Sequence, residues 1–211
     1  MKRTKSNKNE LRLKIVQEAS LAFAKDGIRN VHMDGIAASL GISKRTLYEL
    51  FKDKECLLLE VLRLHHLEMN EYMAEVTSKA DNVLEVIFAF YKRRSRELYD
   101  MNPLFLRDLR RYPNVMKFIY TVQRDVDAVA LRHFKLGVEQ GIFRGDINFE
   151  IINQAMSMMF EMLVYSGITE DYPLYDIFRE ITFLHMRGIT TSKGLKMVDA
   201  FLQSVKENHS L

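Results

Sequence analysis

The sequence is poor in the residues that cross-link or stiffen a chain. Its 211 residues include one cysteine, three prolines, nine glycines and no tryptophan. A single cysteine, Cys56, excludes an internal disulfide and fits a reducing compartment. The prolines, Pro103, Pro113 and Pro173, each lie at an apparent break between helical patterns. Long helices therefore have room to form.

The sequence also lacks a long hydrophobic run. The longest, from Ala155 to Tyr165, is interrupted by Glu161, whereas a membrane-spanning helix needs about 20 apolar residues. The first residues, Met1 to Lys5, are not followed by an apolar segment, so we expect no signal peptide. With 47% hydrophobic and 28% charged residues, the chain is expected to form one large or two modest packed domains, cytoplasmic and away from membranes.

Charge is unevenly distributed along the chain. Residues 1–54 contain twelve Lys or Arg and six Asp or Glu, a net charge of +6, and open with a basic arm at 1–9. The remaining residues contain nineteen and twenty-two, a net charge of −3. A basic N-terminal region favours contact with a polyanion such as nucleic acid. Basic N-terminal tails are common, however, and charge alone leaves that alternative open.

Hydrophobic periodicity predicts helices almost throughout, with no sustained β alternation. Apolar residues recur at helical spacing from Leu11 to Phe23, and Gly27 ends this first helix. The other helices are predicted at 34–40, 44–51, 55–77, 82–100, 104–111, 114–140, 149–167, 174–189 and 193–207. We therefore predict an all-α fold with a three-helix domain at 1–53 and a larger helical domain at 54–211.

Residues 33–52 have the spacing of a helix-turn-helix motif. Ala37 is small enough for two helices to cross closely, and Gly41, four positions later, tolerates the left-handed φ of a turn. Ser43 is a natural N-cap for the second helix, and Asp34 can cap the first. The predicted turn therefore joins two short, separately capped helices.

The second helix of this motif presents basic side chains to the outside. Because Leu47 is expected to point inward, Lys44, Arg45 and Tyr48 must point largely outward. This is the geometry of a recognition helix, whose N-terminal residues enter the major groove of DNA. An ordinary helical hairpin with a solvated charged face is the alternative. The turn, cap, apolar and basic residues at the required offsets favour DNA binding.

The same residues resemble a known family. The strings Ile-Ser-Lys-Arg-Thr-Leu-Tyr at 42–48 and Phe-Lys-Asp-Lys-Glu-Cys-Leu at 51–57, together with Phe23 and Gly27, are similar to the DNA-binding domain of TetR-family transcriptional repressors. The resemblance covers residues 10–62. It implies a homodimer that binds double-stranded operator DNA. It also implies a C-terminal domain that binds a small-molecule effector and thereby releases the DNA.

The resemblance also assigns DNA contacts. The predicted DNA-binding residues are His32, Ser43, Lys44, Arg45, Thr46, Tyr48, Lys52 and Lys54. Lys44 and Arg45 can address O6 and N7 of guanine, whereas Tyr48 and Lys54 match positions that contact the DNA backbone. Arg45 stands where many members have glycine, which implies richer base reading. Leu50 stands where many have histidine or tyrosine, which implies one phosphate contact fewer.

Two helices of the larger domain, at 149–167 and 174–189, are apolar on more than one side. One side can face the helix's own domain, and a second subunit is the simplest partner for the other. The predicted dimer-interface residues are Ile151, Ala155, Met159, Met162, Ile177, Ile181, Leu184 and Gly188. The alternative is that both helices lie in the core of a monomer.

An effector pocket is expected between the helices at 55–77, 82–100 and 114–140. The candidate ligand-binding residues are His66, Met69, Met73, Phe88, Tyr91, Arg94, Ile119 and Gln123. Aromatic and methionine side chains suit a large apolar pocket. A plain hydrophobic core is nevertheless the commoner explanation of such a stripe.

No signature of an enzyme is present. The sequence has no Gly-rich phosphate loop, no metal-ligand spacing and no convincing nucleophile–base pair, so we expect no catalysis, no cofactor and no metal. A helical adaptor that binds another protein remains the alternative to a DNA-binding regulator. Cys56 lies near a predicted helix N-terminus, which favours a lowered pKa.

Overall fold

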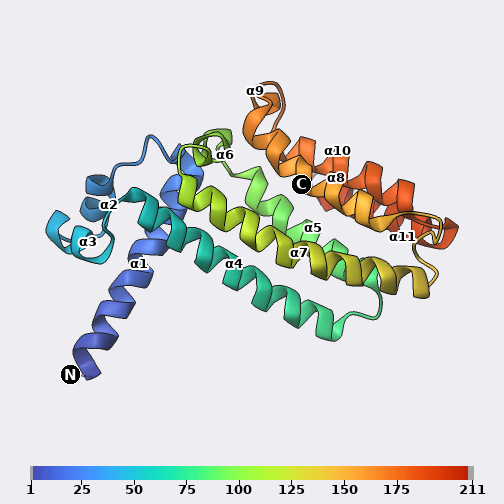
Figure 1. Ribbon diagram of the computed structural model, residues 1–211, viewed down its shortest axis with the longest axis horizontal. Helices are drawn as coiled ribbons and strands as arrows, with labels where there is room; N and C mark the ends of the chain where they lie inside the picture. The colour runs from blue at the N-terminus through green and yellow to red at the C-terminus, as the bar shows by residue number, and fades with distance from the viewer. Residues whose placement is uncertain (1, 209–211) are drawn as a thin grey trace. The chain divides into compact units, whose positions relative to one another are not determined.

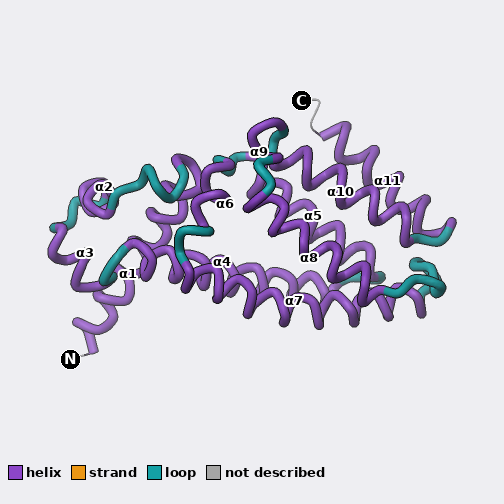
Figure 2. Tube along the Cα trace, turned by 45° about the horizontal axis from the view of Figure 1, so that its top comes forward, coloured by secondary structure: helices purple, strands orange, loops and turns teal. Residues whose placement is uncertain are grey.

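The computed structural model describes the backbone of residues 2–208 and the side chains of residues 7–205. Every regular element in this range is a helix (Figures 1 and 2), which confirms the all-α prediction. The helices are α1 (Lys2–Asp26), α2 (Met33–Ser39), α3 (Lys44–Leu50), α4 (Lys54–Lys79), α5 (Val83–Tyr99), α6 (Pro103–Leu109), α7 (Pro113–Glu139), α8 (Phe149–Tyr165), α9 (Ile168–Asp171), α10 (Leu174–Ile189) and α11 (Ser192–Asn208). No helix of these residues has the length and apolar character needed to cross a membrane.

The first helix ends where the sequence predicts, and two helical segments were not predicted. α1 ends at Asp26, and Gly27 adopts a left-handed φ of 81°, as its position in the sequence predicts. A Cβ at Gly27 would lie 2.8 Å from Cβ of Leu104, so both φ and space require glycine. Residues 2–9, predicted as a basic arm, are the first turns of α1; their side chains up to residue 6 lie outside the described residues. The single turn α9 was not predicted.

Contacts between helices divide the chain into two compact units. The first comprises residues 1–70 and 100–121, and so holds α1–α3, α6 and the first parts of α4 and α7. The second comprises residues 71–99 and 122–211 and holds the remaining helices. The first unit thus extends beyond residues 1–53, and the predicted domain boundary there stays a prediction.

The core of the first unit joins the short helices to α1. α1 packs against α2 and α6, and α2 packs against α3. Phe23 from α1, Ile36 from α2 and Leu47 from α3 are buried together with Phe51, which follows α3. Burial of each such side chain stabilises the fold by about 1.5–3 kcal/mol. The seven-residue helices α2 and α3 depend on this packing, because helices of that length are unstable alone.

The core of the second unit is a cluster of aromatic rings. α5 packs against α10 and α11, which also contact each other. The ring of Tyr91 from α5 lies 5.5 Å from Phe178 and 4.7 Å from Phe183 of α10, centroid to centroid. Phe88 stacks on Phe201 of α11 at 3.9 Å. These ring contacts hold α5 between the last two helices of the chain.

Candidate DNA-binding and effector sites

The turn between α2 and α3 has the geometry that the sequence predicts. Gly41 has a φ of 64°, and its N–H donates to the carbonyl of Ala38 at 3.1 Å. The next N–H, that of Ile42, donates to the carbonyl of Ala37 at 3.0 Å. These bonds satisfy carbonyls that the end of α2 would leave unpaired. The crossing of the two helices is therefore set within a few residues of sequence.

The two helices of the motif are capped differently. Ser43 is the N-cap of α3: its Oγ accepts from the N–H of Thr46 at 3.0 Å, which confirms that prediction. The prediction that Asp34 caps α2 is wrong. The N-cap residue is His32, which makes no side-chain cap bond, and Asp34 instead forms an ion pair with Lys44. A carboxylate two residues inside the helix is free to reach across the turn to that ammonium.

The cations of α3 are exposed and held by carboxylates. Arg45 Nε donates to Oε1 of Glu49 at 2.8 Å, with 88% of the arginine side chain exposed. The hydrogen bond and negative charge of Asp34 raise the pKa of Lys44, which keeps it cationic. Tyr48 is also exposed on this helix. Such exposed pairs contribute little to stability, so phosphate or base acceptors can replace the carboxylates.

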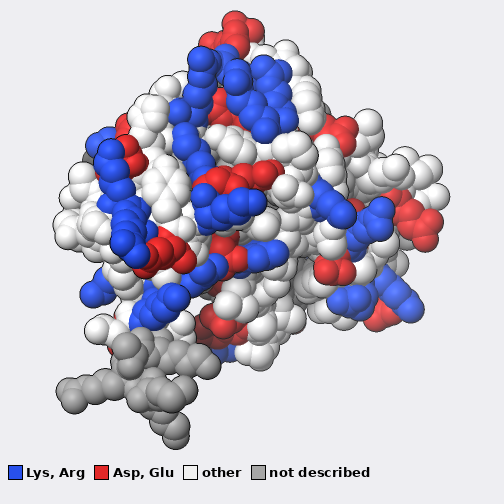
Figure 3. Space-filling view, turned by 60° about the vertical axis from the view of Figure 1, so that its left-hand side comes forward, with Lys and Arg blue, Asp and Glu red and all other residues white. Residues whose placement is uncertain are grey.

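These carboxylate partners were missing from the sequence analysis. The spacing of Arg45 and Glu49, four residues apart on one helix, could have predicted their contact. The pair of Asp34 and Lys44 crosses the turn, so no helical spacing predicts it. Figure 3 views the molecule from the side on which α2 and α3 lie in Figure 1. Acidic and basic side chains alternate over that face.

Lys54, at the start of α4, contacts a segment far from it in sequence. Lys54 Nζ donates to the carbonyls of Ile28 and Arg29, at 2.9 and 3.3 Å. Burial lowers the pKa of Lys54, and the nearby Asp108 carboxylate offsets only part of that. Lys54 thus ties the start of α4 to the loop after α1. Lys52 is exposed, as is His32 before α2.

Cys56 corrects one expectation. A hydrogen bond with Asp53 is the main reason that the pKa of the Cys56 thiol is raised, not lowered. The backbone N–H of Cys56 donates to the same carboxylate at 2.8 Å. The effect of Asp53 on the thiol pKa is thus larger than that of the helix N-terminus, which by itself would lower the pKa.

The comparison with protein families decides the identity of this motif. Residues 15–61, which hold α2, α3, the turn and the adjoining parts of α1 and α4, match the model described as bacterial regulatory proteins, tetR family. Residues 15–61 thus belong to the TetR family of bacterial regulatory proteins. This family consists of DNA-binding regulators rather than enzymes. No curated protein sequence matches the chain.

Solved structures of other regulators share the fold of this chain. A TetR-family transcriptional regulator from Marinobacter aquaeolei VT8 is 20% identical, with a TM-score of 0.71 over 92% of this chain and 97% of that chain. A transcriptional regulator from Saccharomonospora viridis in complex with choline is 20% identical, with a TM-score of 0.69 over 87% and 99%. The ketosteroid transcriptional regulator KstR2 of Mycobacterium tuberculosis is 18% identical, with a TM-score of 0.60 over 86% and 95%. At these identities the likeness concerns the fold.

The candidate effector residues of the regulator are divided between the two units. His66, Met69 and Ile119 belong to the first unit, and the ring of His66 lies edge-on to Phe118 at 6.4 Å. Met73, Phe88, Tyr91, Arg94 and Gln123 belong to the second. Phe88 and Tyr91 are part of the aromatic cluster on α10 and α11, and burial raises the pKa of Tyr91 strongly. Arg94 pairs with Glu97 on its own helix at 3.1 Å.

Gln123 takes part in a polar cluster between α7 and α8. Its Nε2 donates to Oδ1 of Asp127 at 2.8 Å, and Ser157 Oγ donates to the same oxygen at 2.7 Å. The buried polar residue Asn153 lies one turn before Ser157 on α8. Only Gln123 of this cluster was predicted. Asp127 lies four residues later on the same helix, where helical spacing could have found it, whereas Ser157 lies on another helix.

Most candidate dimer residues on α8 and α10 are exposed or half-buried. Ile151 is 64% and Leu184 73% exposed, and Met158, which shares the face of Ile151, is 60% exposed. Ala155 and Gly188 are also exposed, and Met159, Met162 and Ile181 are half-buried. Ile177 is buried within the second unit. Large exposed apolar side chains on neighbouring turns are typical of an interaction surface.

Proposed function

We propose that the chain is a cytoplasmic repressor that binds operator DNA as a homodimer and leaves it when a small molecule binds. The observation that supports this most directly is α3, a helix with a serine cap, a buried anchor and an exposed basic face, within the residues that match the TetR family. A helix presented in this way can enter the major groove with its N-terminal residues.

Base reading falls to the first turn of α3. On binding DNA, Arg45 leaves Glu49 and Lys44 leaves Asp34, and both cations then donate hydrogen bonds to O6 and N7 of guanine. Thr46, Tyr48, Lys52 and the imidazole before α2 supply phosphate contacts, which fix orientation without reading sequence. Lys54 contributes indirectly, because its ammonium donates to backbone carbonyls at the loop after α1.

Dimerisation uses the exposed apolar side chains of α8 and α10. An isologous contact between two copies would cover Ile151, Met158 and Leu184 at once. It would also bring two copies of α3 to one DNA molecule, where sites in successive major grooves are about 34 Å apart. A single recognition helix gives weak specificity, so operator reading depends on this contact.

The effector site is proposed to use the polar cluster of Gln123, Asp127 and Ser157. Oδ2 of Asp127 accepts no hydrogen bond from the described residues, so it can accept one from a ligand. One structural neighbour is a complex with choline and another is described as a ketosteroid regulator. The descriptions of these two neighbours thus refer to compounds of very different polarity. The cluster favours one with a hydrogen-bond donor or a positive charge.

The experiment that tests this function uses DNA from upstream of the protein's own gene. Specific retardation that weakens steeply with salt is expected, because binding releases counterions from the phosphates. A screen of hydroxylated and cationic metabolites, with choline included, should raise the melting temperature for any ligand of the native state. The same compound should then weaken DNA binding. Retardation that is equal for unrelated DNA would contradict a specific repressor.

A further inference from the structure

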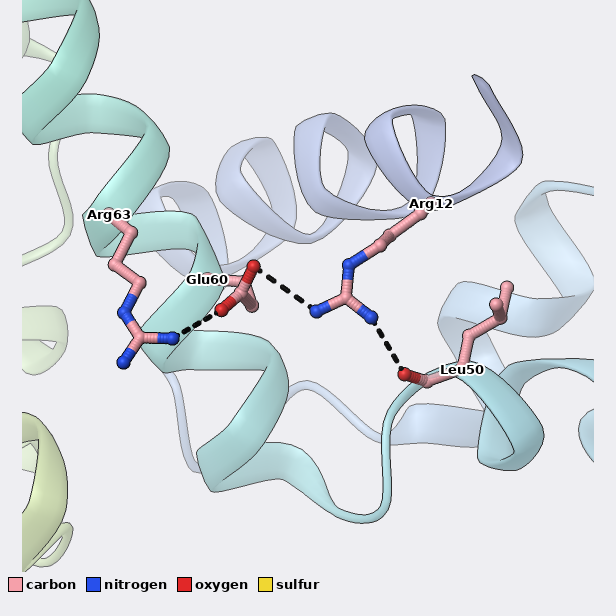
Figure 4. A network of polar contacts seen from close by, with 4 residues as sticks. All are labelled: Arg12, Leu50, Glu60 and Arg63. Atoms are coloured by element: carbon pink, nitrogen blue, oxygen red, sulfur yellow. Dashed lines mark hydrogen bonds and ion pairs between the residues drawn. The ribbon is translucent and has the colours of Figure 1, made fainter. Parts of the chain in front are cut away.

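We propose that Arg12 is a positioning residue for the recognition helix, holding the C-terminal end of α3 to α1 and α4 without touching DNA. The inference rests on the proposed DNA-binding function and extends it to a residue outside the binding surface. The contacts that carry it join three helices of the first unit (Figure 4).

The end of α3 lacks support of its own. α3 has seven residues, no basic residue in its last turn, and Phe51 as its C-cap. The last carbonyls of a helix have no partner within it and carry partial negative charge. Arg12 Nη1, on α1, donates to one of them, that of Leu50, at 3.1 Å. A guanidinium from another helix therefore satisfies the end of α3, while Ser43 caps its start.

The same guanidinium reaches α4. Arg12 Nη2 lies 3.1 Å from Oε2 of Glu60, and the guanidinium carbon lies 4.5 Å from the centre of the Phe51 ring. Phe51 itself is buried. Arginine offers two donors in a fixed planar fork, whereas a lysine ammonium is a compact charge on a flexible stem, so lysine would hold Leu50 and Glu60 together less rigidly. Arg12 thus fixes α3 against two long helices at one point.

Glu60 is also fixed from its far side. Its Oε1 accepts from Nη1 of Arg63 at 2.6 Å (Figure 4). The guanidinium of Arg63 lies 5.9 Å from the centre of the Phe118 ring on α7. Burial alone would raise the pKa of Glu60, but the hydrogen bonds from Arg63 and Arg12 outweigh it and lower the pKa. The carboxylate therefore stays charged and bridges the two arginines at neutral pH.

The geometry argues against a direct role of Arg12 at DNA. Its side chain is 40% exposed, against 88% for Arg45, and two of its nitrogens are already engaged by protein acceptors. Its effect on DNA binding must then pass through the placement of α3. Base contacts require close geometry, whereas phosphate attraction tolerates small shifts. Loss of the bridge should therefore weaken specific binding and leave non-specific binding almost unchanged.

The test compares Arg12→Lys with Arg12→Gln and Glu60→Gln in the full-length protein. Arg12→Lys keeps the charge but loses the planar fork, and we expect it to lose about tenfold in operator affinity, as we also expect of Arg12→Gln. Glu60→Gln removes a negative charge, so electrostatics alone would tighten DNA binding. Positioning predicts that it weakens binding to the operator. Glu68→Gln is the control, since Glu68 is exposed on the same helix and carries the same charge.

The dependence on salt separates positioning from contact. A lost phosphate contact lowers the slope of log affinity against log salt by about one, as we expect for Lys52→Gln. The slope should stay at its wild-type value in Arg12→Gln. Wild-type affinity in Arg12→Lys combined with a lowered slope in Arg12→Gln would make Arg12 a phosphate ligand and overturn the inference.

Stability provides the second readout. Arg12→Lys and Glu60→Gln are expected to keep a melting temperature close to that of the wild type while operator affinity falls. Equal losses on operator and unrelated DNA, in step with a lowered melting temperature, would show a role in folding only and overturn the inference. If the wild-type protein itself fails to distinguish its operator, the proposed function fails as well. Unchanged operator affinity in all three variants would overturn the inference about Arg12 and leave the proposed function intact.

Discussion

The two units of the molecule differ in the distance over which their contacts are made. In the helix-turn-helix of the first unit, Gly41 bonds to Ala38 and Ser43 to Thr46, within three residues of sequence. In the second unit, α5 is held by α10 and α11, and Tyr91 packs on Phe183 and Phe201. The conformation of the helix-turn-helix, here called the head, is determined by contacts between residues close in sequence. That of the second unit is determined by packing between residues far apart in sequence.

This difference reflects what each unit must recognise. A head that reads DNA meets a groove of nearly fixed width, so its turn, cap and crossing have little freedom. A family model accordingly matches residues 15–61. An effector pocket has only to suit its own ligand, and an apolar surface tolerates many packings of similar volume. The match ends at residue 61, within α4.

The largest expected effect comes from a substitution in the second unit that weakens DNA binding by the first. Leu184→Glu places a charge on the apolar surface of α10 without disturbing the core, because this side chain is 73% exposed. We expect monomers in sedimentation, and operator affinity reduced by about 100-fold or more, since each monomer has one recognition helix.

The matched control for this variant is Leu21→Glu. Leu21 on α1 is 71% exposed and lies outside the proposed interface. It should leave both assembly and melting temperature unchanged. Dimers of undiminished stability in Leu184→Glu would place the interface elsewhere.

The second prediction concerns the stability of the second unit. Tyr91→Ala should cost about 3–5 kcal/mol in the free energy of unfolding, because the ring is only 2% exposed among the phenylalanines of α10 and α11. Tyr91→Phe keeps the ring and should cost far less. Denaturant unfolding measures both. A small loss in Tyr91→Ala would indicate a loosely packed site, as expected of a pocket residue.

The first unit also shows how far sequence reasoning reaches. The cap of Ser43, the turn at Gly41 and the end of α1 at Gly27 were predicted because each depends on a residue type at a fixed offset. The cap assigned to Asp34 was wrong, because its carboxylate has a better partner in the cation across the turn. Arg12 was not singled out at all, since its partners lie on other helices.

The second unit resisted prediction for the same physical reason. The apolar periodicity of α8 and α10 predicted that each helix would pack on more than one side. It did not distinguish Ile177, which is buried, from Leu184, which is exposed. Gln123 was named without Asp127 and Ser157, which complete its cluster. Helical spacing gives the face of a helix but not the neighbour that the face meets.

The third prediction tests base reading by the head. Arg45→Ala should weaken operator binding by about 1–3 kcal/mol and relax the preference at one base pair, if the guanidinium replaces Glu49 by guanine. Arg96→Ala removes the same charge from an exposed position on α5 and serves as the control. Competition with operators altered at single positions gives the measurement. A uniform loss at all positions would make Arg45 a phosphate contact instead.

The smallest expected effect is on the pH dependence of the head. The folded pKa of Glu60 is lowered by Arg63 and Arg12, so the charged carboxylate stabilises the native state above the unfolded pKa of about 4.3. That contribution is lost as the pH falls through the lowered, folded value. It should be about 1 kcal/mol or less, because the ion pairs are partly exposed. The free energies of unfolding of the wild type and Glu60→Gln should therefore differ at pH 7 and converge as the pH falls through the lowered, folded pKa. The difference should shrink in high salt, which screens partly exposed charges. A difference that persists undiminished at low pH would mean that Glu60 acts through hydrogen bonds that survive protonation, and the charge would then not be what holds Arg12 in place.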